Sequence, residues 1–289
     1  MITVIICSID PSKSAAAAAN VEVTIGVGHE IFVHDNRQAN WGLAKVYNHY
    51  AARAAGDILC FMHEDVLFLT DDWGREMESF YASHPEAGVV GFFGSQVKTA
   101  SPSPVGYFRK YDASNYRRHP HSGGFAETDV RRTGQDDWSP VVQVDGMCMI
   151  VCREVWAECP FDGERFDGFH LYDLDFSVDI AQRYTNYVCH TALIDHAQDG
   201  RHNDAWYRYN RIFHEKWADR LPMSVIPLTR RELRQVESYT AYKYYKNALD
   251  HRQTAYLGYA RRCFNRWWSL GYWLRLLPHR LRLVNSKRR

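Results

Sequence analysis

His63, Glu64 and Asp65 follow directly on an apolar run, residues 57–62, that has the pattern of a strand buried on both faces of a parallel sheet. Carboxylates at the end of such a strand suit a divalent cation, because hard oxygen ligands bind Mg²⁺ or Mn²⁺ and the cation can neutralise a diphosphate. In a second interpretation, Asp65 or Thr70 accepts amide hydrogen bonds at the start of the next helix. The sequence therefore predicts a metal site or a helix cap here.

A second acidic pair, Asp173 and Asp175, ends the aromatic segment 161–177. A carboxylate can act as a general base and take a proton from a neighbouring hydroxyl. Residues two apart on a helix point in different directions, so one acid can face a ligand while the other fixes the helix end. In the alternative, Asp173 is only an acid in the first turn, favoured by the helix dipole.

Polar residues also follow two other predicted strands. Ser8 and Asp10 come after the first strand, and Asp35 and Asn36 come after the second. Ligands of parallel α/β sheets bind beyond the carboxyl ends of the strands, where the loops converge. We therefore expect these side chains to meet His63 at one site.

The elements that must position these residues alternate along the first part of the chain. We expect an alanine-rich helix at 43–55 and a second helix at Trp73–Ser83. Strands that alternate with helices predict an α/β domain with a mainly parallel sheet. The expected strands are Ile2–Cys7, Val21–Val33 with a turn at its glycines, Asp57–Met62 and Gly88–Phe93.

The segment from Thr99 to Pro140 shows little periodicity and contains Ser-Pro-Ser-Pro and Ser-Gly-Gly. About forty residues is long for an inert connection, so we expect a mobile loop near a binding site. Order is expected to resume at Val141–Val151. Two helical regions are predicted after that, at Leu228–Asp250 and Thr254–Leu277.

The composition is that of a globular protein, with 46% apolar residues among 289. Its seven cysteines form no Cys-x-x-Cys pair, and three lie in apolar runs, which indicates reduced thiols in the cytosol. The amino terminus has no basic leader, so we expect a first strand there rather than a signal peptide. No apolar stretch approaches the ~20 residues of a membrane-spanning helix.

Charge is distributed unevenly along the chain. Residues 251–289 hold ten of the 35 basic residues and no acid, which leaves 25 basic against 34 acidic residues, a net charge of −9, in the remainder. On a helix, Trp267, Leu270, Leu274 and Leu277 form an apolar stripe flanked by arginines. Such a segment can bind an anionic membrane surface, or it can dock on the rest of the chain or on another subunit. No nucleic-acid-binding motif accompanies the charge, so no nucleic-acid partner is expected.

Several of these motifs, taken in order, resemble a known family. The motifs His34-Asp35-Asn36, Asn40-Trp41-Gly42 and Tyr47-Asn48 precede the strand that ends in His63-Glu64-Asp65. Over residues 1–220 this order resembles the family 2 glycosyltransferases of the GT-A fold, in particular their StrF-like branch. The resemblance implies that Asp35 contacts the nucleoside of a nucleotide sugar, and that Asp65 and Glu64 hold Mn²⁺ or Mg²⁺ on its diphosphate. The further donor-binding residues that it implies are Ser8, Asp10, Asn40, Gly42, Asn48 and His63, the last in place of the first acid of the family's usual motif.

The later motifs resemble the acceptor side of the same family. Phe161–Ser177 is similar to the family's FDE-like turn and ED-type motif, and Gly146 lies on the matching acceptor strand. By this resemblance Asp173 is the catalytic base. His196 completes the metal shell through an imidazole nitrogen, with His202 as the second choice.

The resemblance and the residues together predict a GT-A-type catalytic domain at 1–225 and a helical, basic and aromatic extension at 226–289. We expect an inverting, metal-dependent transfer of sugar from a nucleotide-diphosphate sugar to a hydroxyl of a saccharide or a lipid-linked acceptor. The expected location is the cytoplasm or the inner face of its membrane, in surface polysaccharide or glycolipid assembly.

Two alternatives stay open. A sugar nucleotidyltransferase also needs strand-end acids and a metal, but the loop Ser8–Ser14 is neither Gly-rich nor strongly basic, as a triphosphate site requires. A non-catalytic nucleotide- or sugar-binding subunit with the same fold is the other alternative, because His63 stands where an acid is usual.

Overall fold

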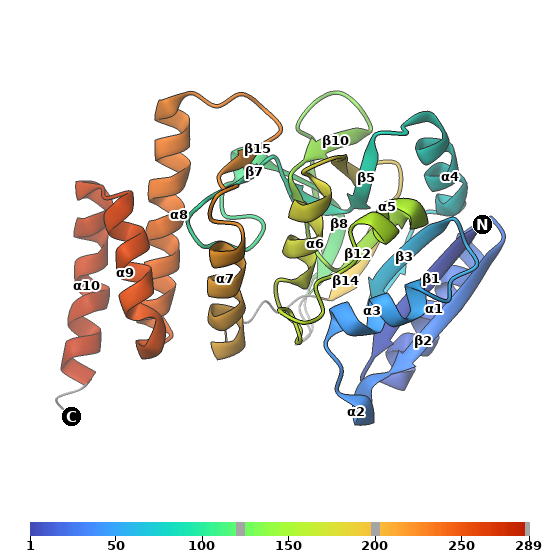
Figure 1. Ribbon diagram of the computed structural model, residues 1–289, viewed down its shortest axis with the longest axis horizontal. Coiled ribbons are helices and arrows are strands. Elements are labelled where there is room, and N and C mark those ends of the chain that lie inside the picture. The colour runs from blue at the N-terminus through green and yellow to red at the C-terminus, as the bar shows by residue number, and fades with distance from the viewer. Residues whose placement is uncertain (120–124, 198–202, 287–289) are drawn as a thin grey trace.

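The computed structural model describes residues 1–119, 125–197 and 203–286 (Figure 1). Within these ranges seven strands form the central sheet. They are β1 (Ile2–Ser8), β2 (His29–Asp35), β3 (Ile58–His63), β5 (Ala87–Gly91), β10 (Trp138–Val141), β12 (Cys148–Cys152) and β13 (Thr185–Cys189). Their order is β10-β13-β5-β12-β3-β1-β2. β2, β1 and β3 are parallel, β12 is antiparallel to β3 and β5, and β13 is parallel to β5.

The parallel strands bring their carboxyl ends to one edge of the sheet. Ser8 pairs with Asp35, and Cys7 pairs with His63. The apolar run of β3 is buried along its length from Ile58 to Met62, as expected for a strand covered on both faces. The polar residues that follow β1, β2 and β3 therefore start from the same edge, which confirms the expected α/β arrangement.

Helices connect and cover these strands. The expectation of a strand from Val21 was wrong, because a helix that Asp10 caps runs on to Thr24. Its buried residues Ser14, Ala17, Val21 and Thr24 recur at helical spacing, so the burial of one helix face overrides the β preference of the valines. The helices before residue 220 are α1 (Pro11–Thr24), α2 (Asn36–Ala39), α3 (Leu43–Ala51), α4 (Trp73–Ser83), α5 (Arg153–Glu158), α6 (Tyr172–Ile180) and α7 (Asp204–Lys216).

A second sheet includes much of the segment that was expected to be a mobile loop. Its strands are β4 (Val66–Phe68), β6 (Phe93–Ser95), β8 (Asp112–His119), β9 (Glu127–Arg131), β11 (Gln143–Val144) and β14 (Ile194–Ala197). The order is β11-β6-β8-β14-β4, with β9 beside β8. Strand β8 was not predicted because its sequence is polar. Its polar side chains are accommodated in the sheet because they form hydrogen bonds and ion pairs with other segments. The Asn115 amide donates to the Ala192 carbonyl oxygen at 2.6 Å, and Arg117 pairs with Asp195.

The chain ends in three helices, α8 (Arg230–Asp250), α9 (Leu257–Arg266) and α10 (Leu270–Ser286), which lie together at one end of the molecule (Figure 1). Short elements complete the described chain: the paired strands β7 (Val97–Lys98) and β15 (Met223–Ser224), and the 3₁₀ helices η1 (Arg109–Tyr111) and η2 (Thr254–Tyr256). Among the helices of the described residues, none combines the length and apolar character that crossing a bilayer requires.

The terminal helices share the hydrophobic core of the sheets. Tyr244, Phe264 and Leu276 belong to the same cluster of buried side chains as Ile5 of β1. The fully buried Glu237 of α8 also accepts hydrogen bonds from the Ala100 and Ser101 amides and from the Ser101 hydroxyl. The division of the chain at residues 225 and 226 stays a prediction, but the two parts pack as one body.

Candidate active site

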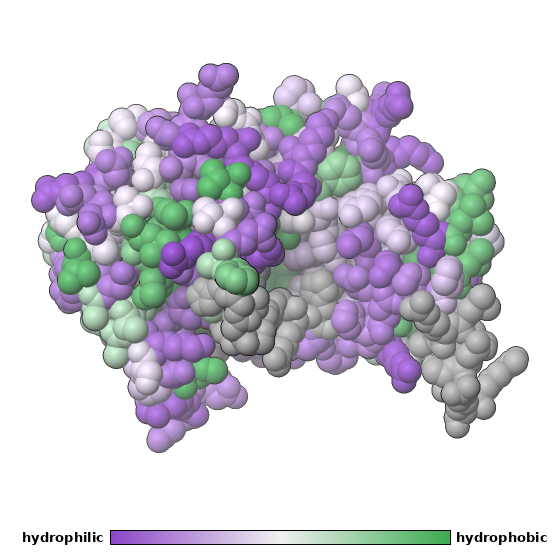
Figure 2. All heavy atoms as spheres, turned by 180° about the vertical axis from the view of Figure 1, so that it is seen from behind, coloured by the Kyte–Doolittle hydropathy of each residue, from purple (hydrophilic) through white to green (hydrophobic). Residues whose placement is uncertain are grey.

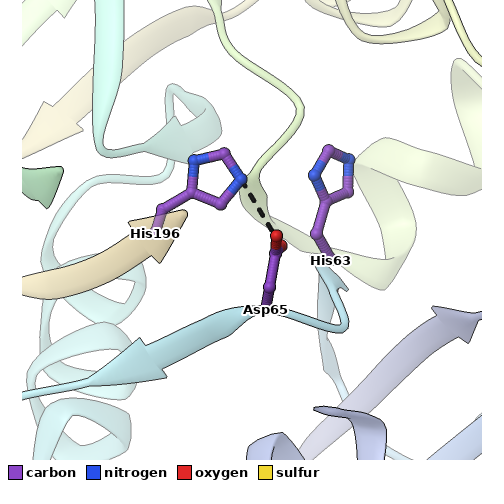
Figure 3. A group of neighbouring side chains, drawn as sticks. All are labelled: His63, Asp65 and His196. Atoms are coloured by element: carbon purple, nitrogen blue, oxygen red, sulfur yellow. Dashed lines mark ion pairs between the residues drawn. The ribbon is translucent and has the colours of Figure 1, made fainter. Parts of the chain in front are cut away.

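Three side chains that are far apart in the sequence or on different elements converge beside the central sheet (Figure 3). His63 ends β3, Asp65 lies in the turn before β4, and His196 lies on β14, where it pairs with Val66 of β4. Each of the three offers one ligand atom, and these atoms lie within 4.8 Å of one another. His196 Nε2 is 3.5 Å from Asp65 Oδ1, and the two imidazole rings are 5.7 Å apart. We call this group the His-Asp-His cluster.

The chemistry of the His-Asp-His cluster fits a divalent transition-metal ion. Burial, followed by the neighbouring His196, lowers the pKa of His63 to about 4, so its imidazole is neutral near pH 7. Neutral imidazole is the form that ligates a metal. Two imidazoles and one carboxylate suit Mn²⁺ better than Mg²⁺, because Mg²⁺ takes oxygen ligands almost exclusively. The expected second choice, His202, lies outside the described residues.

Glu64 does not join this cluster, contrary to the expectation. Its Oε2 accepts hydrogen bonds from the Ser8 hydroxyl at 2.6 Å, the Ile9 amide at 2.9 Å and the Asp10 amide at 2.8 Å. Strand β3 ends at His63, and Glu64 and Asp65 form the turn before β4, in which Glu64 faces the loop after β1 while Asp65 faces the cluster. Glu64 therefore stabilises the loop after β1. His63, which was expected to bind the nucleotide, lies beside Asp65 where Glu64 was expected as a metal ligand.

The second strand end is arranged around Asp35. Arg37 donates to both oxygens of the Asp35 carboxylate, at 2.8 and 2.6 Å, and these bonds lower the pKa of Asp35 to about 2. Asn36 closes the following turn, because its side chain exchanges hydrogen bonds with the backbone of Trp41. Asn40 ends α2 in the left-handed conformation, with a φ of 46°. Asp35 is thus an exposed, ionised carboxylate at the edge where β1 and β3 also end.

Two further expected donor-binding residues serve packing in this structure. The Asn48 side chain exchanges hydrogen bonds with both backbone groups of Phe161 and accepts one from the Trp156 indole, so it ties α3 to the segment after α5. Gly42 approaches the backbone of Asp167 so closely that a Cβ would lie 2.4 Å from its carbonyl carbon. Glycine is therefore required there by the close approach of two chain segments.

Asp173 lies in the first turn of α6, beside Gly146, which lies in the turn between β11 and β12 and not on a strand as expected. Its Oδ2 accepts a hydrogen bond from the Gly146 amide at 2.9 Å. Burial, and then the charge of Asp145, raise the pKa of Asp173 to about 7. Asp145 was not singled out in the sequence, and its position next to Gly146 was the available signal. Burial also raises the pKa of Asp145, to about 6, so two carboxyl groups with raised pKa values lie next to each other.

Tyr172 connects Asp173 with the His-Asp-His cluster. Its hydroxyl lies 3.0 Å from His63 Nε2 and donates to the Gly146 carbonyl oxygen at 3.2 Å. Glycine is needed at position 146, because a Cβ there would lie 2.4 Å from this hydroxyl. The sequence contained Tyr172 but gave no reason to choose it among 18 tyrosines. The two parts of the site are therefore adjacent.

Asp175 has a different role from Asp173, as the helical spacing predicts. It is 2% exposed and accepts hydrogen bonds from Lys216 Nζ at 2.9 Å and from the Trp217 indole at 2.8 Å. Burial raises the pKa of Asp175 to about 6 despite the nearby Lys216. The Asp175 carboxylate joins α6 to the end of α7 through these hydrogen bonds. The Asp173 side chain is partly exposed to solvent.

The comparison with protein families decides which group the chain falls into. A model described as a glycosyltransferase-like family matches residues 3–217. The chain belongs to this family. The StrF-like branch of the glycosyltransferases stays a prediction for it. No curated protein sequence matches this glycosyltransferase-like chain.

Solved structures are similar to the chain at low sequence identity. The structure of GalNAc-T7 with UDP, GalNAc and Mn²⁺ is 11% identical with a TM-score of 0.53, and the match covers 86% of this chain and 50% of that one. This glycosyltransferase-like chain therefore spans half the length of that protein. The mannosyltransferase PcManGT from Pyrobaculum calidifontis, with GDP-Man and Mn²⁺, is 13% identical with a TM-score of 0.49, over 98% of this chain and 83% of that one. The first likeness confirms the expected GT-A type of α/β fold.

Proposed function

We propose that this glycosyltransferase-like chain moves a sugar from a nucleotide-diphosphate sugar to an acceptor hydroxyl, with inversion at the anomeric carbon. The observation that carries the proposal is the His-Asp-His cluster, whose ligand atoms lie within 4.8 Å of one another. It lies at the carboxyl edge of the sheet, where α/β proteins bind nucleotides, and it adjoins Asp173 through Tyr172. GalNAc-T7, which shares the fold, was solved with a nucleotide and Mn²⁺, which supports the same ligand class here.

The residues divide between donor and acceptor. His63, Asp65 and His196 would hold the divalent ion, which stabilises the negative charge of a departing diphosphate when it is bound. Asp35 is exposed at the end of β2 and is proposed to contact the nucleoside. Ser8 and Asp10 shape the first loop through their hydrogen bonds to Glu64.

Asp173 is proposed to take the proton of the acceptor hydroxyl. A single carboxylate base is what an inverting displacement requires. Its raised pKa, about 7, makes Asp173 a stronger base than an exposed aspartate while it still ionises near neutral pH. The hydrogen bond from the Gly146 amide orients the carboxylate toward the turn between β11 and β12.

We also propose an acceptor carried on a lipid, as in assembly of a surface polysaccharide or glycolipid at the inner face of a membrane. The support is the basic and aromatic character of residues 251–289, which contain ten basic residues and no acid. A saccharide free in solution is the alternative acceptor.

The proposal is tested by nucleotide binding. Isothermal calorimetry with UDP, GDP, dTDP and CDP, with and without Mn²⁺, is carried out on the wild type and on Asp65→Asn, with the exposed Asp71→Asn as the matched control. We expect one nucleotide to bind in the presence of Mn²⁺, and the Asp65 variant alone to lose this binding. Absence of metal-dependent binding to every nucleotide would overturn the proposal. Binding without sugar transfer from any donor would favour the non-catalytic subunit.

A further inference from the structure

Helix α10 docks on α8 through a small set of side chains. The Tyr272 ring of α10 stacks on Tyr242 of α8 at 4.9 Å between centroids, and Leu276 is fully buried. His279 of α10 also pairs with Asp250 at the end of α8. These contacts account for the attachment of α10, so the docking alternative raised by the sequence is realised by these residues.

Another set of apolar side chains in the same helices stays at the surface. Leu270 and Leu274, one turn apart on α10, are 57% and 52% exposed, and Trp268 just before the helix is 46% exposed. Figure 2, viewed from behind, shows apolar atoms gathered along the edge where α10 lies. The stripe expected from the sequence is therefore divided, because Trp267 and Leu277 are partly buried while Leu270 and Leu274 face water. We call Trp268, Leu270 and Leu274 the apolar face.

Four exposed arginines lie on the two helices on either side of Trp268. Arg261, Arg262 and Arg266 of α9 and Arg275 of α10 are all exposed, and in the described part of the chain no ion pair joins any of them to an acid. Three of the four guanidinium groups lie instead over aromatic rings of the same helices, at 5.6 to 5.9 Å from the ring centroids. The remainder of the chain carries a net charge of −9, so the excess of basic over acidic residues lies in residues 251–289.

We infer that the apolar face and its four arginines form a docking surface for an anionic lipid bilayer. Exposed leucine and tryptophan side chains suit the acyl chains of a membrane interface, and exposed arginines on the same two helices suit its anionic headgroups. A protein that binds the same surface would need an apolar groove flanked by acidic residues. A second copy of this chain is the competing partner, because residues 1–250 carry a net charge of −9. The inference does not depend on glycosyl transfer.

The test is flotation of the full chain with vesicles. Vesicles of phosphatidylcholine with a third of phosphatidylglycerol are compared with vesicles of phosphatidylcholine alone, at low and at high salt. We expect co-flotation with the anionic vesicles at low salt. Arg261→Gln, Arg262→Gln, Arg266→Gln and Arg275→Gln should each lower the partition coefficient by about fivefold, because a basic residue at an anionic surface contributes about that factor. Leu270→Ser with Leu274→Ser should lower it by about tenfold or more.

Matched control variants replace exposed apolar side chains and exposed arginines at other places on the surface. Val23→Ser with Val130→Ser takes two exposed apolar side chains from α1 and β9. A second control replaces four exposed arginines outside the C-terminal helices by glutamine, namely Arg53, Arg109, Arg183 and Arg220. Both controls should float like the wild type, and circular dichroism should show all variants folded.

Three outcomes overturn the inference. Recovery of the wild type in the soluble fraction with anionic vesicles is the first. The second is sedimentation of the wild type as a dimer that Leu270→Ser with Leu274→Ser converts to monomer, since the apolar face would then be covered by a second copy. The third is equal loss of flotation in the controls, which would show a non-specific charge effect. If no nucleotide binds but the chain floats with anionic vesicles, the proposed glycosyl transfer is overturned and the membrane-docking surface is not.

Discussion

Asp173 and Asp145 make the reaction sensitive to pH at the residue scale. Asp173 accepts a proton only when it is ionised, and burial with the charge of Asp145 raises its pKa to about 7. We expect kcat/KM of the wild type to rise about tenfold per pH unit below about 7 and to level off above it. Asp145→Asn removes a like charge, so the pKa of Asp173 falls and the rising limb moves to lower pH. Initial rates between about pH 5 and 9 measure this shift.

The matched control for that experiment is Asp219→Asn, an exposed acid outside the site, which should leave the profile unchanged. A profile in Asp145→Asn that coincides with the wild type would contradict the assignment of Asp173 as the titrating base.

Asp173 also separates catalysis from donor binding. Asp173→Asn keeps the shape of the side chain and its place beside Gly146 but cannot take a proton. We expect kcat to fall by about a hundredfold or more, while the affinity for the nucleotide with Mn²⁺ stays within about twofold. Steady-state kinetics and calorimetry on the same preparation check both values. Retention of more than half of the wild-type kcat would exclude Asp173 as the base.

The metal preference belongs to the residue scale as well. The His-Asp-His cluster supplies two imidazole nitrogens, which favour Mn²⁺ over Mg²⁺. We expect half-maximal nucleotide binding at a concentration of Mn²⁺ about tenfold or more below that of Mg²⁺. A calorimetric titration of nucleotide at fixed levels of each ion measures this ratio. His196→Gln should reduce the ratio, whereas His84→Gln, a change remote from the cluster in sequence and fold, should leave it unchanged.

At the scale of elements, Asp175 holds α7 against α6. Asp175→Ala leaves the Trp217 indole without its acceptor and removes one of the two carboxylates that pair with Lys216. We expect the free energy of unfolding to fall by about 2 kcal/mol, because the Trp217 indole loses its acceptor while Lys216 keeps only Asp162. Urea unfolding followed by circular dichroism measures the change. Arg165→Ala removes an exposed partner of Asp162 and should leave the free energy of unfolding nearly unchanged. Equal effects of the two changes would contradict this view of Asp175.

The whole molecule is expected to unfold as one unit, because α8, α9 and α10 share the core of the sheets. Differential scanning calorimetry of the full chain should give a single transition whose calorimetric and van't Hoff enthalpies agree. A chain that ends at Pro227 loses the buried Tyr244, Phe264 and Leu276 as well as the bonds from Glu237 to residues 100 and 101. We expect this shortened chain to lack a cooperative transition. Two resolved transitions, one of them kept by the shortened chain, would contradict the shared core and support independent domains.

The sequence by itself determined the local elements and the edge of the sheet at which the candidate site residues lie. The continuous apolar run of β3 and the helical spacing of α4 follow from side chains close in sequence, so both were predicted with nearly their observed bounds, whereas α3 ends at Ala51, earlier than the predicted residue 55. The order of motifs indicated the family, which the match over residues 3–217 confirms.

Only the tertiary structure decided which side chains meet. Pairing of β14 with β4 brings His196 to Asp65, and the turn between β3 and β4 directs Glu64 to the loop after β1 while Asp65 stays beside His63. The polar strand β8 was hidden for a related reason, because its hydrogen-bond partners come from distant segments. Contacts between segments far apart in the chain depend on strand order and register, and neither quantity is encoded in the local pattern of a single stretch.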